Sequence, residues 1–270
     1  MGASLEPAQG GVKRPPLVAL TTDFGLQDPF VGVMKGVILG ICPGACVVDV
    51  THGIPPQDVL AGCLALGDAA PYFPPGTVHV AVVDPGVGSG RPAVAVRTPR
   101  ALFVAPDNGI LSFLPPDDVL EVRRLENPDL WLRPVSRTFH GRDVFAPVAA
   151  HLARGVPLDE VGPEHPGLRR LRLPEPVRER DAVRGEVLGF DRFGNAVTNI
   201  REQDLPRPGR AVEVAGRRMP LLGAYAEALP GRALALWGST GRLELSVREG
   251  SAREALGLRR GDPVRVLLDG

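Results

Sequence analysis

The chain has 270 residues, of which 44% are hydrophobic, and its 31 basic and 31 acidic side chains give a formal net charge of zero at pH 7. This length suits one large domain or two modest ones, and the balanced charge excludes the basic field that a nucleic-acid or membrane-surface partner would require. The charged fraction of 23% also excludes a disordered chain and a coiled coil.

Strands and helices alternate in the first part of the chain. Short buried strands are predicted at residues 17–22, 46–51, 77–84, 91–98 and 101–107. Helices are predicted at 29–39, at 58–70 and at about 144–154, and the first of them has its apolar residues 30, 33, 34, 37 and 38 spaced like one face. This alternation predicts a Rossmann-like α/β layered domain over residues 17–162.

The composition changes after residue 162. Residues 163–180 contain four prolines and many charges, which predicts an exposed linker. Short β-type segments follow at 184–191, 196–200, 211–216, 232–238, 242–249 and 262–270, separated by Gly, Pro or Asn. They predict a small antiparallel β-barrel domain over residues 181–270.

The three cysteines, Cys42, Cys46 and Cys63, have no C-x-x-C spacing and indicate neither a disulfide framework nor a zinc ribbon. We expect them to be buried and reduced. Residues 1–16 lack the apolar core of a signal peptide, and no stretch approaches 18 uninterrupted apolar residues. We therefore expect a soluble, cytoplasmic protein.

Polar clusters interrupt the apolar segments at strand ends, where ligands bind in α/β sheets. The cluster T-T-D-F-G follows the first strand, and its Asp23 can bind a vicinal diol such as a ribose, ligate a metal, or cap a turn. The loop from Asp84 to Arg91 is rich in glycine but opens onto a strand, so it lacks the helix N-terminus that binds pyrophosphate. Its chain reversal can instead bring Asp84 and Arg91 side by side.

Two further clusters follow along the chain. P-D-N-G at residues 106–109 is a strong turn signal. T-F-H-G-R-D at 138–143 places His140 before an apolar helix, and histidine is the side chain whose ordinary pKa suits proton transfer at neutral pH. Structural interpretations stay open: an ion pair in a turn for Asp84 and Arg91, and a capping or surface position for His140.

Near the C-terminal region, Asp191 to Asn199 places polar side chains, Phe193 and a glycine between two β segments, which taken alone is a hairpin loop. Gly238 to Gly241 is a similar turn, and Glu244 lies on the strand that follows it.

Taken together, T-D-F-G, V-D-P-G-V-G-x-x-R, A-P-D-N-G, T-F-H-G-R-D and D-x-F-G-N-x-x-T-N, in this order over residues 21–199, resemble the S-adenosylmethionine hydroxide adenosyltransferase family. That family is the hydrolytic relative of the bacterial fluorinase and chlorinase. The resemblance implies an α/β N-terminal domain, a β-barrel C-terminal domain, and a homotrimer that holds its ligand between neighbouring subunits. It also implies attack of water or hydroxide on the ribose C5′ of S-adenosylmethionine, releasing adenosine and methionine, with no cofactor and no metal.

The resemblance also assigns roles by position. Asp84, Arg91 and His140 match the water-handling set, and Asp23 matches the residue that binds the ribose diol. Asn195, with Phe193 beside it, lies in the adenosine-contacting motif. The residues placed to hold adenine or the methionine end are Asp191, Ser239, Glu244 and the backbone near Val247.

The chemistry agrees with this set, because a sulfonium is already a good leaving group and the protein must chiefly orient a weak nucleophile. Gly141 follows His140 where a fluorinase is expected to carry Ser, which favours hydroxide over a halide. Two other hypotheses stay open. One is a metal-dependent phosphoesterase that uses Asp23, Asp84, His140 and Asp143 as ligands, and the other is a non-catalytic sensor of adenosine or S-adenosylmethionine.

Overall fold

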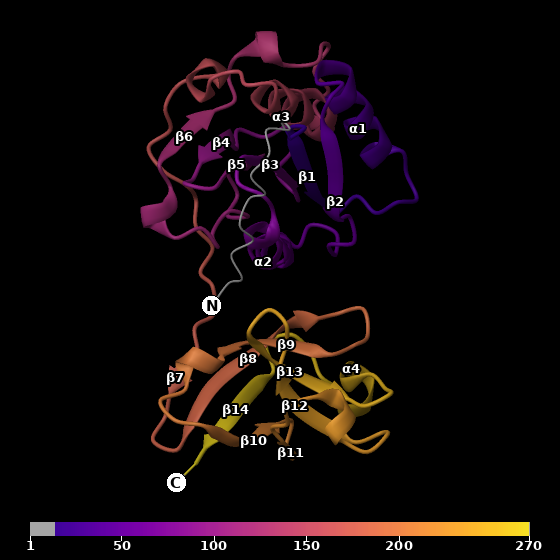
Figure 1. Ribbon diagram of the computed structural model, residues 1–270, viewed down its shortest axis with the longest axis vertical. Coiled ribbons are helices and arrows are strands. Elements are labelled where there is room, and N and C mark those ends of the chain that lie inside the picture. Colours follow the sequence, from indigo (N-terminus) through magenta and orange to yellow (C-terminus); the bar gives the residue numbers. More distant parts are fainter. Residues whose placement is uncertain (1–13, 270) are drawn as a thin grey trace. The chain divides into compact units, whose positions relative to one another are not determined.

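In the computed structural model, which describes residues 14–269, the chain divides into two compact units (Figure 1). The first unit ends at Leu171 and the second begins at Arg172. The linker and domain boundaries predicted at 162 and 180 stay predictions. Within the described residues, no helix is long and apolar enough to cross a membrane.

A six-stranded sheet forms the first unit, in the order β2-β1-β3-β5-β4-β6. Its strands are β1 (Leu17–Thr22), β2 (Cys46–Thr51), β3 (Thr77–Val82), β4 (Ala93–Arg97), β5 (Ala101–Pro106) and β6 (Glu121–Arg124). The pairs β1–β2, β1–β3 and β3–β5 are parallel, whereas β4 runs antiparallel to both β5 and β6. The predicted α/β class is therefore confirmed.

Helices cover both faces of this sheet (Figure 1). The helices α1 (Phe30–Ile41) and α3 (Ala146–Ala153) pack on one face, where Met34 and Ala149 join Val80 in a single apolar core. The helix α2 (Val59–Ala69) packs on the other face, in a second core that includes Leu66 and Phe103. Because β1 and β3 are covered on both sides, nearly all of their residues are buried and most of them are apolar.

Two predictions of burial are partly wrong. In α1, Met34 and Ile38 are buried, but Phe30 and Val33 are 40% and 37% exposed. The helix is apolar around most of its circumference, so spacing alone does not single out the face that the sheet covers. The strand at 46–51, predicted to be buried, is the edge strand β2, and its Cys46 is exposed.

Part of the predicted linker is anchored to the first unit. The Oδ1 atom of Asp107 accepts the main-chain N–H of Arg169 at 2.7 Å, and its Oδ2 atom lies 3.2 Å from Nε2 of His165. The main-chain N–H of Leu171 donates to Oγ of Ser112 at 2.7 Å. His165, Arg169 and Leu171 are therefore held by the segment that follows β5 instead of crossing open solvent.

The second unit is an antiparallel, barrel-like sheet in the order β11-β10-β14-β8-β9-β13-β12, with β7 paired to β8. Its strands are β7 (Val177–Arg178), β8 (Ala182–Phe190), β9 (Ala196–Arg201), β10 (Gly209–Val214), β11 (Arg217–Pro220), β12 (Ala233–Trp237), β13 (Arg242–Val247) and β14 (Pro263–Leu268). A bridge between Leu221, just after β11, and Ala235 of β12 brings the two ends of this path together. One short helix, α4 (Ala252–Leu256), packs Ala252 and Leu256 into the barrel core. The predicted β-barrel is confirmed.

Candidate active site

The site of the first unit lies where the strand order reverses. From β1 the chain crosses to β2 on one side of it and then returns to β3 on the other side. The carboxyl ends of β1 and β3 are therefore adjacent, and a crevice forms at such a switch point in α/β sheets. Asp23 follows β1 and Asp84 follows β3, so both carboxylates reach this edge.

The loop after β1 is held by a histidine that the sequence analysis did not single out. The Oγ1 atom of Thr22 lies 2.8 Å from Nδ1 of His52 and accepts the main-chain N–H of Phe24 at 3.2 Å. Gly25, at a φ of 66°, donates its N–H to the carbonyl oxygen of His52 at 2.8 Å. Nε2 of His52 lies 2.9 Å from Oδ1 of Asp49. The sequence alone does not indicate these contacts between His52 and the loop after β1, because they form only when β2 pairs with β1.

Asp23 itself is half-buried, and its Oδ2 atom accepts the main-chain N–H of Gln57 at 2.8 Å. Gln57 has a φ of 65°, a left-handed conformation that is uncommon for residues other than glycine. Such strained residues concentrate at ligand sites. One oxygen of the Asp23 carboxylate is thus oriented by a strained main-chain donor at the rim of the site.

Asp84 and Arg91 form the ion pair that the loop reversal predicts. The Nε atom of Arg91 donates to Oδ1 of Asp84 at 2.8 Å, and the second guanidinium nitrogen, Nη2, donates to Oδ2. Their side chains are only 5% and 10% exposed, respectively. The guanidinium also lies 5.2 Å from the ring centre of Phe145. A two-pronged, buried contact of this kind fixes both side chains in one orientation.

His140 completes this group. Its Nδ1 atom lies 3.3 Å from the Nη2 atom of Arg91. Burial lowers the pKa of His140 below its ordinary value, and the positive charge of Arg91 lowers it further. Since a guanidinium has only donors, Nδ1 is the acceptor in this contact and the ring proton of neutral His140 lies on Nε2. A π-helical turn, Gly141–Phe145, begins directly after it, and such turns are frequent at functional sites.

A pocket of about 420 Å³ brings the predicted residues together, and its size lies in the range of small-molecule sites. Asp23, Asp84 and His140 all line it, and Arg91 lies directly behind the last two. The apolar part of the wall is an edge-to-face cluster of three phenylalanine rings, with centres 5.1–5.8 Å apart. These rings belong to Phe24, Phe30 and Phe139. Other residues that line the pocket are Pro56, Gln57, Val82, Pro85, Val87, Thr138 and Gly141.

Gly141 has little room for a side chain. A Cβ atom added there would lie 3.1 Å from the ring of Phe139 and 3.3 Å from both Met34 and Phe24. Gly141 therefore packs directly on the aromatic wall, and a serine at this position would need these side chains to move by a few tenths of an ångström.

Asp143, the fourth proposed metal ligand of the phosphoesterase hypothesis, points elsewhere. Its carboxylate forms an ion pair with Arg142, with Oδ1 2.6 Å from Nε, and accepts the main-chain N–H of Ser136 at 2.8 Å. Across residues 14–269 there is no group of three or more His, Cys, Asp or Glu side chains that could hold a metal ion. The arrangement of Asp143 thus fits a structural role in the loop before His140.

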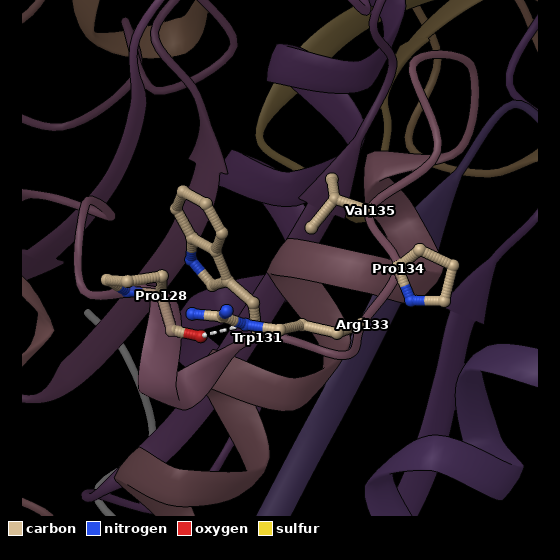
Figure 2. Close-up of a pocket in the computed structure, with 5 residues that line it drawn as sticks. All are labelled: Pro128, Trp131, Arg133, Pro134 and Val135. Atoms are coloured by element: carbon tan, nitrogen blue, oxygen red, sulfur yellow. Dashed lines mark hydrogen bonds between the residues drawn. The ribbon is translucent and has the colours of Figure 1, made fainter.

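A second hollow, of about 690 Å³, lies elsewhere on the first unit (Figure 2). It is lined by Pro128, Trp131, Arg133, Pro134 and Val135. This lining is mostly apolar and contains neither a carboxylate nor an imidazole, so we place the candidate active site in the pocket at the switch point.

The predicted residues of the second unit form a separate group. Oδ1 of Asp191 accepts the main-chain N–H groups of Phe193 and Asn195 at 2.9 and 2.8 Å, and its Oδ2 accepts the side-chain amide of Asn195 at 2.9 Å. This carboxylate therefore builds the β8–β9 turn, where Gly194 has a φ of 81°. The turn exposes 76% of Phe193, whose ring is free to cover a flat ligand.

Glu244 lies on β13 beside a residue that the sequence analysis missed. The hydroxyl of Tyr225 donates to Oε1 of Glu244, and the hydroxyl of Ser246 donates to the same atom at 2.9 Å. Burial and the Glu244 carboxylate raise the pKa of Tyr225. Ser239 is exposed in its turn, whereas the side chain of Val247 is 8% exposed and packs in the barrel core. Tyr225 stands in no recognisable motif, and only its aromatic side chain in a Gly- and Ala-rich segment could have indicated it.

Comparison with known proteins identifies the family of this chain. Residues 18–162 match the family model of the SAM hydroxide adenosyltransferase N-terminal domain, and residues 185–265 match that of its C-terminal domain. The chain belongs to the SAM hydroxide adenosyltransferase family. The resemblance predicted from the five motifs is thereby confirmed.

Relatives of this SAM hydroxide adenosyltransferase chain include an (R)-S-adenosyl-L-methionine hydrolase from Thermus thermophilus, 48% identical over 93% of this chain and 99% of the relative. A fluorinase from Nocardia brasiliensis is 30% identical over 94% of this chain and 97% of its own. Among solved structures, an uncharacterized conserved protein from Thermotoga maritima has a TM-score of 0.87 and 38% identity, covering 93% of this chain and 99% of the other.

Proposed function

We propose that this enzyme hydrolyses S-adenosylmethionine to adenosine and methionine, through attack of water or hydroxide on the ribose C5′. The observation that carries the proposal is the assembly of Asp84, Arg91 and His140 beside Asp23 at one pocket. Relatives 48% and 42% identical to this chain are named (R)-S-adenosyl-L-methionine hydrolases. The reaction needs one group that binds the ribose and another that orients water, and the pocket offers Asp23 for the first and the Asp84, Arg91 and His140 group for the second.

The reaction balances without a further reagent. The water oxygen forms a bond to C5′, the C5′–sulfur bond breaks with its electron pair going to sulfur, and the neutral thioether of methionine leaves. The water gives up one proton, so the cationic substrate and water become adenosine, methionine and a proton. No acid is needed for the leaving group, because sulfur becomes neutral as the bond breaks.

The residues of the first unit divide this work. Asp23 accepts hydrogen bonds from the ribose hydroxyls and so fixes C5′ in the pocket. Arg91, which Asp84 holds, and His140 orient the nucleophile in line with the breaking bond. Holding two reactants in the correct geometry raises the rate of their reaction. His140 or Asp84 accepts the proton, and a positioned base contributes about 10²–10⁴-fold.

The residues of the second unit hold the rest of the substrate. We assign adenine to Phe193 and Asn195, with Asp191 keeping their turn in place. Glu244, with Ser239 and the backbone near Val247, completes this group. No cofactor and no metal take part in the proposed reaction, in contrast to the phosphoesterase alternative, which would lose its activity in EDTA.

We also propose that the enzyme is a homotrimer whose sites lie between subunits. The apolar outer face of α1 supports an association, since Val33 and Leu39 are 37% and 43% exposed. Gly32, Gly36 and Gly40 recur on the same helix with open space around each. Val33→Glu should lower the molar mass measured by light scattering, and an unchanged mass would contradict this use of α1. The cytoplasmic location stays a prediction.

The deciding experiment is incubation of the purified protein with S-adenosylmethionine in H₂¹⁸O, followed by chromatography and mass spectrometry. We expect adenosine with ¹⁸O on its 5′ oxygen, and methionine in equal amount, with or without EDTA. Methylthioadenosine or S-adenosylhomocysteine as product, or binding without turnover over hours, would refute the proposal, and the last result would favour the sensor hypothesis.

The configuration of the substrate is tested in the same assay. The prefix L already defines the α-carbon, so the (R) in the names of the relatives refers to the sulfonium. We therefore expect the (R) epimer at sulfur to be consumed faster than the (S) epimer. Equal rates for the separated epimers would contradict this preference.

The roles of the first-unit residues separate in the kinetic constants. His140→Ala or Asp84→Ala should lower kcat much more than it changes KM, whereas Asp23→Ala should mainly raise KM, because only Asp23 binds a part of the substrate that does not react. Equal losses in both constants for all three variants would contradict these assignments.

A further inference from the structure

The P-D-N-G turn, Pro106–Gly109, does not line the pocket, yet its position in the sheet relates it to the chemistry. It follows β5, and β5 lies between β3 and β4. Since β5 is parallel to β3 and antiparallel to β4, the carboxyl end of β5 lies beside the end of β3 and the start of β4. These are the two points where the Asp84–Arg91 loop leaves and re-enters the sheet.

The turn is hydrogen-bonded to both ends of that loop. The side-chain amide of Asn108 donates to the carbonyl oxygen of Val83 at 2.8 Å, one residue before Asp84. The main-chain N–H of Asp107 donates to the carbonyl oxygen of Pro92 at 2.9 Å, one residue after Arg91. The loop that carries the ion pair is thus held immediately before its first residue and immediately after its last residue by two consecutive residues of one turn.

The Asn108 side chain is itself fixed in one orientation. Its Oδ1 atom accepts the main-chain N–H of Ile110 at 3.2 Å, which leaves the NH₂ group facing Val83. Val83 is fully buried, and a buried carbonyl oxygen that loses its donor costs about 1–3 kcal/mol unless it moves to find another. Without Asn108, the cheapest response is a shift of the loop at Asp84.

We propose that Asn108 is a positioning residue for the reaction, which acts by fixing the chain just before Asp84 and thereby the placement of Asp84 and Arg91 against His140. The proposal rests on the proposed function, since it assigns Asn108 to the residues that orient the nucleophile. Asn108 touches neither substrate nor nucleophile; it acts through Val83.

Asn127 supplies a matched control. Its side-chain amide also donates to a distant carbonyl oxygen, that of Glu160, at 2.8 Å, and its Oδ1 atom also accepts the main-chain N–H two residues ahead, that of Asp129, at 3.1 Å. Both asparagines are half-buried in the first unit. The two differ in the carbonyl that each holds: Val83 is buried and lies between Val82 and Asp84 of the pocket, whereas Glu160 is exposed and neither it nor its chain neighbours line the pocket.

The experiment compares Asn108→Ala and Asn127→Ala in the whole protein. A misplacement of about 1 Å costs about 10²-fold in rate, so we expect Asn108→Ala to lower kcat about 10–100-fold and to change KM less than about threefold. Asn127→Ala should keep kcat within about twofold, although it loses the same hydrogen bonds. If Asn108→Ala does not fold, Asn108→Ser replaces it, since its hydroxyl serves Ile110 but does not reach Val83.

A second readout does not depend on turnover. The titration of His140 is followed by NMR with ¹³C-labelled histidine, and we expect the His140 pKa to rise in Asn108→Ala, because Arg91 lowers it more than Asp84 raises it. Asn127→Ala should leave it unchanged. Wild-type kcat and His140 titration in Asn108→Ala, or equal losses in both variants, would overturn the proposal. A wild-type protein that does not convert S-adenosylmethionine would instead refute the proposed function, and the titration would still decide the role of Asn108.

Discussion

The Asp84–Arg91 pair should separate the stability of the protein from its activity. We consider three variants: Arg91→Gln, which leaves a carboxylate 5% exposed, Asp84→Asn, which leaves a guanidinium 10% exposed, and the double variant, which leaves neither charge. The perturbation removes one charge at a time and then both, at nearly constant volume.

The geometry sets the magnitude. Two unit charges about 4 Å apart attract by about 4 kcal/mol at the effective dielectric constant of a protein. Breaking a buried pair costs about 3–5 kcal/mol, chiefly because the remaining charge is left without a partner. Each single variant should therefore lose about 3–5 kcal/mol of unfolding free energy, and the double variant, which leaves no buried charge unpaired, should lose less than either single variant.

Urea unfolding at pH 7, followed by tryptophan fluorescence, measures these free energies. The chain has two tryptophans, and Trp237 belongs to the second unit, so a Trp237→Phe background reports on Trp131 and the first unit alone. Turnover of S-adenosylmethionine is measured on the same samples. All three variants should lose kcat by about 100-fold or more, since both charged groups orient the nucleophile.

Two results would refute this reasoning. Additive free energies in the double-mutant cycle would mean that the two groups are not paired. Recovery of turnover together with stability in the double variant would mean that the charges serve only the fold and not the reaction.

Three further predictions concern single residues. Because burial and Arg91 lower the pKa of His140, activity should stay level at neutral pH and fall only as the pH drops through that lowered value; a fall beginning above pH 6.5 in the kcat/KM profile would contradict a neutral His140. Burial lowers the pKa of His79 from 6.5 to about 4, so between these values only the unfolded chain binds the proton, and the unfolding free energy should drop by about 3 kcal/mol as the pH falls from 6.5 to 4. This drop should be absent in His79→Leu in urea unfolding, and its persistence would assign it to other groups. Gly88→Ala should lower kcat about tenfold, because the added Cβ would meet the carbonyl oxygen of Arg137. Gly76 has a similar positive φ but open space around it, so Gly76→Ala should lower only the stability. Equal kcat in both variants would show that the close approach of Gly88 to Arg137 is dispensable for the reaction.

The candidate site was largely predictable from local patterns. Asp23, Asp84 and His140 are polar residues that interrupt apolar runs where strands or helices begin or end, and a glycine or proline one or two residues after each marks a turn. The pairing of Asp84 with Arg91 followed from one short loop between two strands. Such contacts depend on a few residues that are close in sequence, so the local sequence pattern is enough to predict them.

Several elements were missed for the opposite reason. Strands β6 and β11 have the sequences EVRR and RRMP, and α4 is five residues long, so none has enough apolar period to be recognised. β6 is an edge strand at the end of its sheet, and β11 ends the strand path of the barrel. Their pairing partners, and not their own composition, make them strands.

The amino-acid order alone thus determined the two kinds of layer, the family, and which residue types stand at the strand ends. Tertiary structure decided which ends meet. It placed β1 beside β3, so that Asp23 and Asp84 share a pocket, and it placed β5 between β3 and β4, so that Asn108 reaches Val83. Strand order depends on how all the helices pack on the sheet at once, and no local stretch of sequence contains that information.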